Sequence, residues 1–104
     1  MEIDVLKECG QEDIISRKAG AIIRALIIKN WSEKEISLVF SGKEIGYVSF
    51  FDEAIALLLK RNNKTKEEIV KKIKFQDIQP TDRNLLNHVF IARVMEQQKD
   101  KKGF

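Results

Sequence analysis

The sequence predicts a single small α/β domain whose central sheet of three to four strands packs against helices, in the order β-α-β-α-α-β-α. Short apolar runs with the composition of buried strands alternate with longer runs whose apolar residues recur at helical spacing. The 104 residues suffice for one core, and 43% hydrophobic with 34% charged residues is typical of globular proteins. We expect residues 1–98 to form the domain and residues 99–104 to form a polar, flexible C-terminal tail.

The first half of the chain predicts two strands and one helix. Ile3 and Val5 alternate with charged neighbours, which indicates a strand with one buried face. Residues 13–29 place isoleucine, leucine and alanine along one face of a helix. The β-branched and aromatic run from Ile36 to Phe40 then favours a buried central strand.

The second half predicts three helices and one strand. Residues 50–61 carry a continuous apolar helical stripe. Thr65 with Glu68 three positions later has the spacing of a capping box at the start of a short basic helix. A strand follows over residues 73–75, and a last helix over residues 81–98.

The composition of the chain bears on its disulfides, its metal sites and the cellular compartment in which we expect it. Cys9 is the single cysteine, so the chain has no internal disulfide, and we expect a reducing, cytoplasmic environment without a metal site or cofactor. The longest apolar stretch, residues 21–28, is interrupted by Arg24 and is too short to cross a bilayer, so we expect no membrane association. Glu2 and Asp4 also interrupt any apolar leader at the beginning of the sequence.

The segment around Ser49 is the most informative part of the chain, since it places a hydroxyl at the start of a helix just after a strand and a glycine-bearing turn. Such a position tolerates a phosphate or another anion. Ser49 with Asp52 also has the spacing of a helix cap, and both interpretations stay open. Asp52 and Glu53 point about 100° apart on a helix, so they do not form a catalytic pair, and we attribute them to the helix dipole. The sequence therefore predicts no enzyme.

Three short motifs resemble those of a known family. They are Ser16-Arg17 followed by Gly20, Ile23 and Arg24; Val39-Phe40-Ser41-Gly42 before the turn; and Ser49-Phe50-Phe51-Asp52-Glu53-Ala54 at the next helix start. In these residues and in the order of its elements, the chain resembles the STAS-like domain family, small bacterial α/β proteins related to the anti-sigma factor antagonists.

The resemblance implies a non-catalytic, regulatory protein-interaction module. In the antagonists a serine at the corresponding turn is phosphorylated, and the matching residue here is Ser49. The surface that the resemblance implies for the partner comprises Ser49, Phe50, Asp52 and Glu53. The partner implied is a serine kinase or a histidine-kinase-like ATPase, and a homodimer stays open.

Arg17 and Arg24 lie seven positions apart, and hence close to one face of the first helix. They could bind an anion together. The alternative is that both pair with carboxylates of the protein itself or pack their stems along the domain edge.

The basic segment over residues 60–74 supports an alternative function in nucleic-acid binding. Its candidate contacts are Lys64, Lys71, Lys72 and Lys74. No aromatic residue interleaves these charges as a base-stacking surface requires, so a solvated helix face is the simpler explanation of them.

Overall fold

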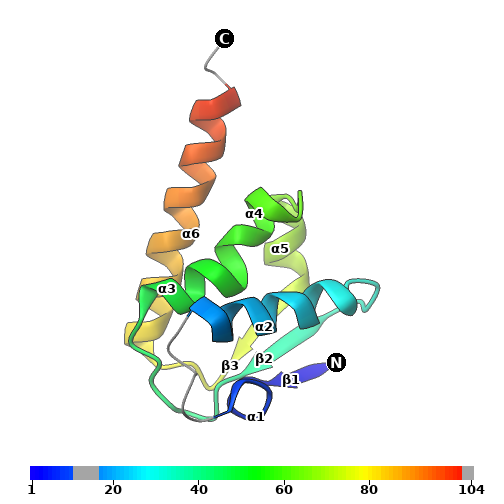
Figure 1. The fold of residues 1–104 in the computed structure, drawn as a ribbon, viewed down its shortest axis with the longest axis vertical. Helices are drawn as coiled ribbons and strands as arrows, with labels where there is room; N and C mark the ends of the chain where they lie inside the picture. The colour runs from blue at the N-terminus through cyan, green and yellow to red at the C-terminus, as the bar shows by residue number, and fades with distance from the viewer. Residues whose placement is uncertain (11–16, 102–104) are drawn as a thin grey trace.

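The computed structural model describes residues 1–10 and 17–101, which form a mixed α/β fold around a three-stranded parallel sheet (Figure 1). The strands are β1 (Glu2–Asp4), β2 (Ile36–Val39) and β3 (Ile73–Gln76), in the spatial order β1-β2-β3. Leu38 of β2 pairs with Ile3 on one side and Phe75 on the other. The predicted α/β class is confirmed.

The helices are α1 (Val5–Cys9), α2 (Arg17–Lys29), α5 (Lys66–Lys72), α6 (Pro80–Lys101), and a composite helix of three segments. That composite helix begins as α3 (Val48–Phe51), widens into a π-helical segment η1 (Asp52–Ala56), and ends as α4 (Leu57–Arg61). The predicted start of α2 at residue 13 lies outside the described residues. Within the described chain, no helix combines the length and the hydrophobicity needed to cross a bilayer.

The predicted first strand is shorter than expected, and an additional helix follows it. Asp4 caps α1 by accepting a hydrogen bond from the Lys7 amide, and Gly10 ends the helix at a φ of 73°. Val5 and Cys9 lie one turn apart and are both buried. The assignment of Val5 to a strand was therefore wrong, and the element order is β-α-α-β-α-α-β-α.

The hydrophobic core lies between one face of the sheet and the helices. Ile36, Leu38 and Phe40 alternate along and just beyond β2, and all three are buried, as is Ile73 of β3. Figure 1 shows α2 crossing in front of the sheet, with the composite helix beside it. Phe50 and Phe51 at the start of the composite helix are buried in the same core.

Gly20 allows α2 to pack directly on the composite helix. A Cβ atom at position 20 would lie 2.7 Å from the Phe50 carbonyl oxygen and 2.8 Å from the Glu53 Cβ. Both distances are shorter than any ordinary carbon contact, so only glycine fits this crossing. The close approach brings the side chains of α2 within reach of the carboxylates of η1.

The start of α6 fixes the loop that leads into α3. The Asp82 carboxylate is fully buried and accepts hydrogen bonds from the Ile45 amide at 2.6 Å and the Gly46 amide at 2.8 Å. At its other end α6 continues to Lys101, three residues beyond the helix end expected near residue 98, and the rest of the tail lies outside the described chain.

Candidate functional site: a buried carboxylate in an ionic network

Asp52, the first residue of η1, is the centre of an ionic network that joins three helices. Its side chain is only 4% exposed. Arg93 of α6 donates two parallel hydrogen bonds to the Asp52 carboxylate, from Nε to Oδ1 and from Nη2 to Oδ2, each 2.8 Å long. Arg17 of α2 donates a third bond to Oδ2 at 3.0 Å. A paired guanidinium fork is the strongest geometry for holding a carboxylate, so this contact fixes α6 against the composite helix.

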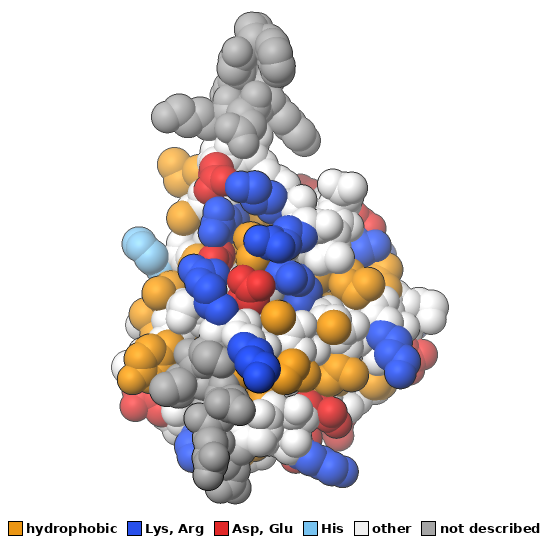
Figure 2. Space-filling model, viewed as in Figure 1, with side chains coloured by type: hydrophobic (Ala, Val, Ile, Leu, Met, Phe, Trp, Pro, Cys, Tyr) orange, Lys and Arg blue, Asp and Glu red, His pale blue; other side chains and the backbone are white. Residues whose placement is uncertain are grey.

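Glu53 extends the network along α2. Arg17 donates to its Oε2 at 3.2 Å, and Arg24 donates to its backbone oxygen at 3.1 Å while lying 3.6 Å from Oε1. Figure 2 shows this face of the molecule, where Lys and Arg side chains surround acidic ones over α2, α3 and α4. The predicted common face of Arg17 and Arg24 is confirmed, and the anions that they contact are carboxylates of the protein itself.

The network keeps its members charged. Hydrogen bonds from Arg93 lower the pKa of the Asp52 carboxyl below its ordinary value; burial opposes this effect, and the contact with Arg17 adds to it. The bonds to Asp52 also raise the pKa of the Arg17 and Arg93 guanidinium groups. Asp52 therefore stays ionised and doubly paired, which suits a structural link and not a proton acceptor.

A π-helical turn sits where the network is built. Residues 52–56 carry one extra residue in the turn, and such single-turn distortions of α-helices occur often at functional positions. Here the turn directs Asp52 toward α6, while Glu53 faces α2. The helix dipole was the expected role of these two carboxylates, and the structure adds that each has arginine partners.

The structure changes the interpretation of Ser49. The helix begins at Val48, one residue before Ser49, and its N-cap residue Tyr47 makes no side-chain capping bond. Ser49 therefore lies inside the first turn and is not the cap. The start of the helix is instead set by the loop that Asp82 holds, a contact from 36 or 37 positions away.

Two residues of the predicted partner surface are not available at the surface. Phe50 is 1% exposed and Asp52 is 3% exposed, so neither can form a docking face in this structure. Ser49 and Glu53 are partly buried. The exposed apolar groups at this end of the helix are Tyr47 and Val48, at 51% and 43%. Hydrophobic periodicity did not distinguish them from the buried phenylalanines beside them.

The basic segment does not form one free surface. The Lys72 ammonium donates to the Trp31 and Glu33 carbonyl oxygens at 2.7 and 2.5 Å, and it also lies 5.1 Å from the centre of the Trp31 ring. Lys64 lies over the same ring at 4.6 Å. Lys71 and Lys74 remain exposed. Of the four candidate nucleic-acid contacts, Lys72 is thus engaged in holding α5 to the end of α2.

Two important residues were missed as site residues. They are Arg93 on the inward-facing stripe of α6 and Asp82 at the start of the same helix. An arginine on an inward-facing stripe was the available signal, because such a charge requires a buried partner. No comparable signal identified Asp82 as the clamp of a distant loop.

No protein-family model matches the chain, and comparisons with curated proteins and with solved structures likewise find no significant match. Among the described residues, no three His, Cys, Asp or Glu side chains are grouped as a metal ion requires. Burial raises the pKa of the Cys9 thiol to about 11, so this side chain is a poor nucleophile at neutral pH.

Proposed function

We propose that the protein is a non-catalytic regulatory interaction module of the STAS-like type, which docks a partner on the surface where the chain enters α3. The observation that supports this most directly is the pairing of Asp52 with Arg93 and Arg17. The most buried carboxylate of the site is committed to holding the fold together. Beside it, Tyr47 and Val48 remain exposed.

The ionic network gives this surface a rigid base. Arg93 holds the composite helix to α6, and the Asp82 clamp holds the loop before it. Docking on a rigid surface costs less conformational entropy than docking on a loop that must first become ordered. Exposed aromatic and aliphatic groups over such a base are the usual anchors of protein interfaces.

Ser49 supplies a means of regulation within this proposal. It precedes Asp52 by about one helical turn. Arg17, whose guanidinium contacts Asp52, has a side chain that is 56% exposed. From this helical spacing we infer that a phosphate on Ser49 would lie within reach of Arg17. The negative charge of Asp52 is already compensated by two arginines, which removes much of the repulsion that a phosphate would otherwise face. The resemblance suggests a serine kinase or a histidine-kinase-like ATPase as the partner.

The proposal is tested by affinity capture from the source organism with three baits: the unchanged protein, Val48→Asp and Ile91→Asp. Aspartate is favourable in a first helical turn, so Val48→Asp should stay folded. Ile91 lies on α6 and is 57% exposed, which makes it a matched control. We expect an ATPase that the unchanged and Ile91→Asp baits recover and the Val48→Asp bait loses. Recovery of the same ATPase by all three baits would exclude this docking face.

Regulation is measured separately by mass spectrometry of the Ser49 peptide after incubation of the captured complex with ATP. Phosphate on Ser49, together with weaker capture by a Ser49→Glu bait, is the expected result. A Ser49→Ala bait serves as the control and should bind like the unchanged protein. If Ser49 carries no phosphate and the Glu and Ala baits bind equally, Ser49 has no switching role.

A further inference from the structure

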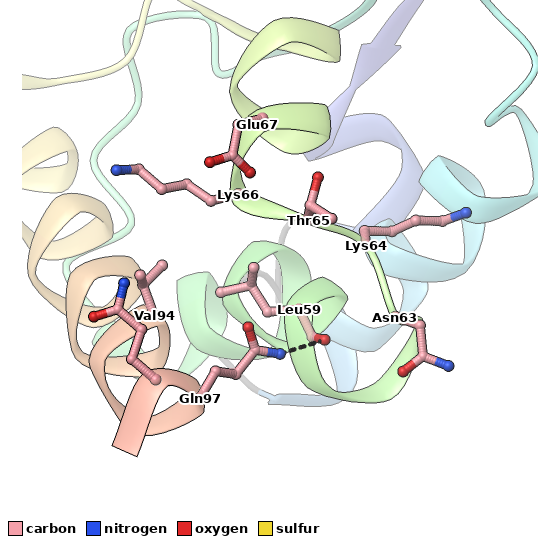
Figure 3. A pocket seen from close by; sticks show the side chains of 9 residues that line it. Leu59, Asn63, Lys64, Thr65, Lys66, Glu67, Val94 and Gln97 are labelled. Carbon is pink, nitrogen blue, oxygen red and sulfur yellow. Dashed lines mark hydrogen bonds between the residues drawn. The ribbon is translucent and has the colours of Figure 1, made fainter. Parts of the chain in front are cut away.

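A groove runs between α5 and α6, with η1 and α4 as its floor. At one end it opens into a cavity of about 360 Å³, whose lining includes Leu59 of α4, Lys66 of α5 and Val94 of α6. Figure 3 shows this end, with Leu59 pointing into the space between the two helices. At the other end lies a cavity of about 90 Å³ beside β3, whose lining includes Ile55, Val70 and Phe90.

The two cavities have separate linings, and we take them as the two ends of one groove because the same helical elements line both. Their floor residues, Ile55 and Leu59, are four positions apart, and so are Phe90 and Val94 on the α6 wall. On the opposite wall, Lys66 and Val70 of α5 have the same separation. Four residues correspond to about one turn of a helix, so each of the three elements connects the two cavities through neighbouring residues.

The end of the groove beside β3 is apolar and open. All but one of the residues that line it are hydrophobic, and the exception is the neutral Asn87. Val70 on its rim is 57% exposed. Phe75 and Phe90 are only partly buried although both pack against the core. This end therefore presents apolar side chains that are without full cover in the described chain.

Positive charges border the groove. The Lys74 ammonium lies 3.5 Å from the Val70 carbonyl oxygen, and the Arg83 guanidinium lies over the Phe75 ring at 5.9 Å from its centre. Lys66 extends from the start of α5 toward the α6 side in Figure 3. Glu67 is the one acidic residue among those that line the two cavities. The rim thus favours an acidic partner over a basic one.

We propose that this groove binds an acidic amphipathic helix of another protein. The floor and the α6 wall repeat apolar residues at one-turn intervals, Ile55 with Leu59 and Phe90 with Val94, which is the pattern that receives the i, i+4 and i+7 side chains of a helix. The α6 wall from Leu86 to Gln97 is ~17 Å long, enough for about three helical turns. Acidic residues flanking the apolar stripe of the partner would face Lys66, Lys74 and Arg83. This site is separate from the α3 surface, and the two are tested with different variants.

The test uses the full chain and a fluorescein-labelled acidic peptide of about 18 residues, with leucines at i, i+4, i+7 and i+11 and glutamates beside them. A second peptide carries lysine in place of every glutamate. Fluorescence anisotropy gives the affinities, and amide chemical shifts in ¹⁵N-labelled protein locate the site. We expect saturable binding of the acidic peptide, shifts along α5 and α6, and at least ~10-fold weaker binding of the lysine peptide.

Val70→Glu and Ile22→Glu compare two exposed apolar positions on helices: Val70 lines the groove, whereas Ile22 lies on α2 and lines neither cavity. Val70→Glu should weaken binding of the acidic peptide at least ~10-fold, and Ile22→Glu should leave it unchanged. The proposal is overturned by equal binding of both peptides, by shifts confined to other elements, or by equal effects of the two variants. Self-association that Val70→Glu abolishes would instead assign the groove to a second copy of the chain, and binding of a single-stranded RNA that the peptide displaces would assign it to nucleic acid.

Discussion

Asp52 and Arg93 connect the π-helical turn to the long C-terminal helix through two hydrogen bonds of 2.8 Å, although 41 positions separate them in the sequence. The Asp52 side chain is almost fully buried, whereas the Arg93 side chain is 26% exposed. Breaking a buried pair by removing one partner is costly because the other charge is left without compensation. This contact therefore makes the stability of the fold depend on one arginine of α6.

Replacing Arg93 by alanine should lower the free energy of unfolding by about 3 kcal/mol, the lower end of the range for breaking a buried pair, because Arg17 still contacts Asp52. Urea denaturation followed by circular dichroism measures the change. Arg17→Ala is the control: its side chain is 56% exposed, so the loss should stay below about 1 kcal/mol. Equal losses of unfolding free energy for the two variants would show that the paired hydrogen bonds from Arg93 stabilise the fold no more than the single bond from Arg17.

The same pair predicts a dependence of stability on pH. The folded pKa of Asp52 lies below the ordinary value of 3.8, so its ionised form stabilises the fold at neutral pH. As the pH falls below about 4, the unfolded chain takes up a proton before the folded one, and this contribution is lost. We expect Asp52→Asn to be less stable than the unchanged protein at neutral pH, with a difference that narrows in acid. A constant difference in urea titrations from neutral pH to about pH 3 would contradict the assignment.

Gly20→Ala should destabilise the protein by about 1–3 kcal/mol, because the added methyl group would meet the Phe50 carbonyl oxygen at 2.7 Å. The sign of the effect is decisive. The same substitution in a helix interior without such a contact stabilises by about 1 kcal/mol. Thermal unfolding of the variant measures the effect. A raised midpoint temperature would mean that α2 and the composite helix can move apart to accept the methyl group without loss of stability.

Asp82→Ala should cost about 2–3 kcal/mol, since it leaves the Ile45 and Gly46 amides without their acceptor. Thr81→Ala is the neighbouring control. Its hydroxyl contacts Glu44 at 2.7 Å on the exposed surface, so its removal should have little effect. Amide hydrogen exchange at Ile45 and Gly46 gives a local measurement: protection should fall in the Asp82 variant and persist in the Thr81 variant.

Local patterns predicted most of the secondary structure. The capping box of Thr65 and Glu68 is present as expected, with bonds of 2.9 and 3.1 Å, because both partners lie within one helical turn. The strands β2 and β3 also lie where β-branched and aromatic residues indicated. The short helix α1 was missed because Val5 continues the alternation that begins at Ile3, although it also lies one helical turn from Cys9.

The sequence by itself determined the α/β class, the approximate positions of most elements and the common face of Arg17 and Arg24. These properties depend on residues that are neighbours in the chain, so periodicity and capping reveal them. Only the tertiary structure decided that Arg93 pairs with Asp52, that Asp82 clamps the loop before α3, and that a groove stays open between α5 and α6. The physical reason is that the cost of burying a charge depends on a partner brought close by the path of the whole chain, and that path is not a local property of the sequence.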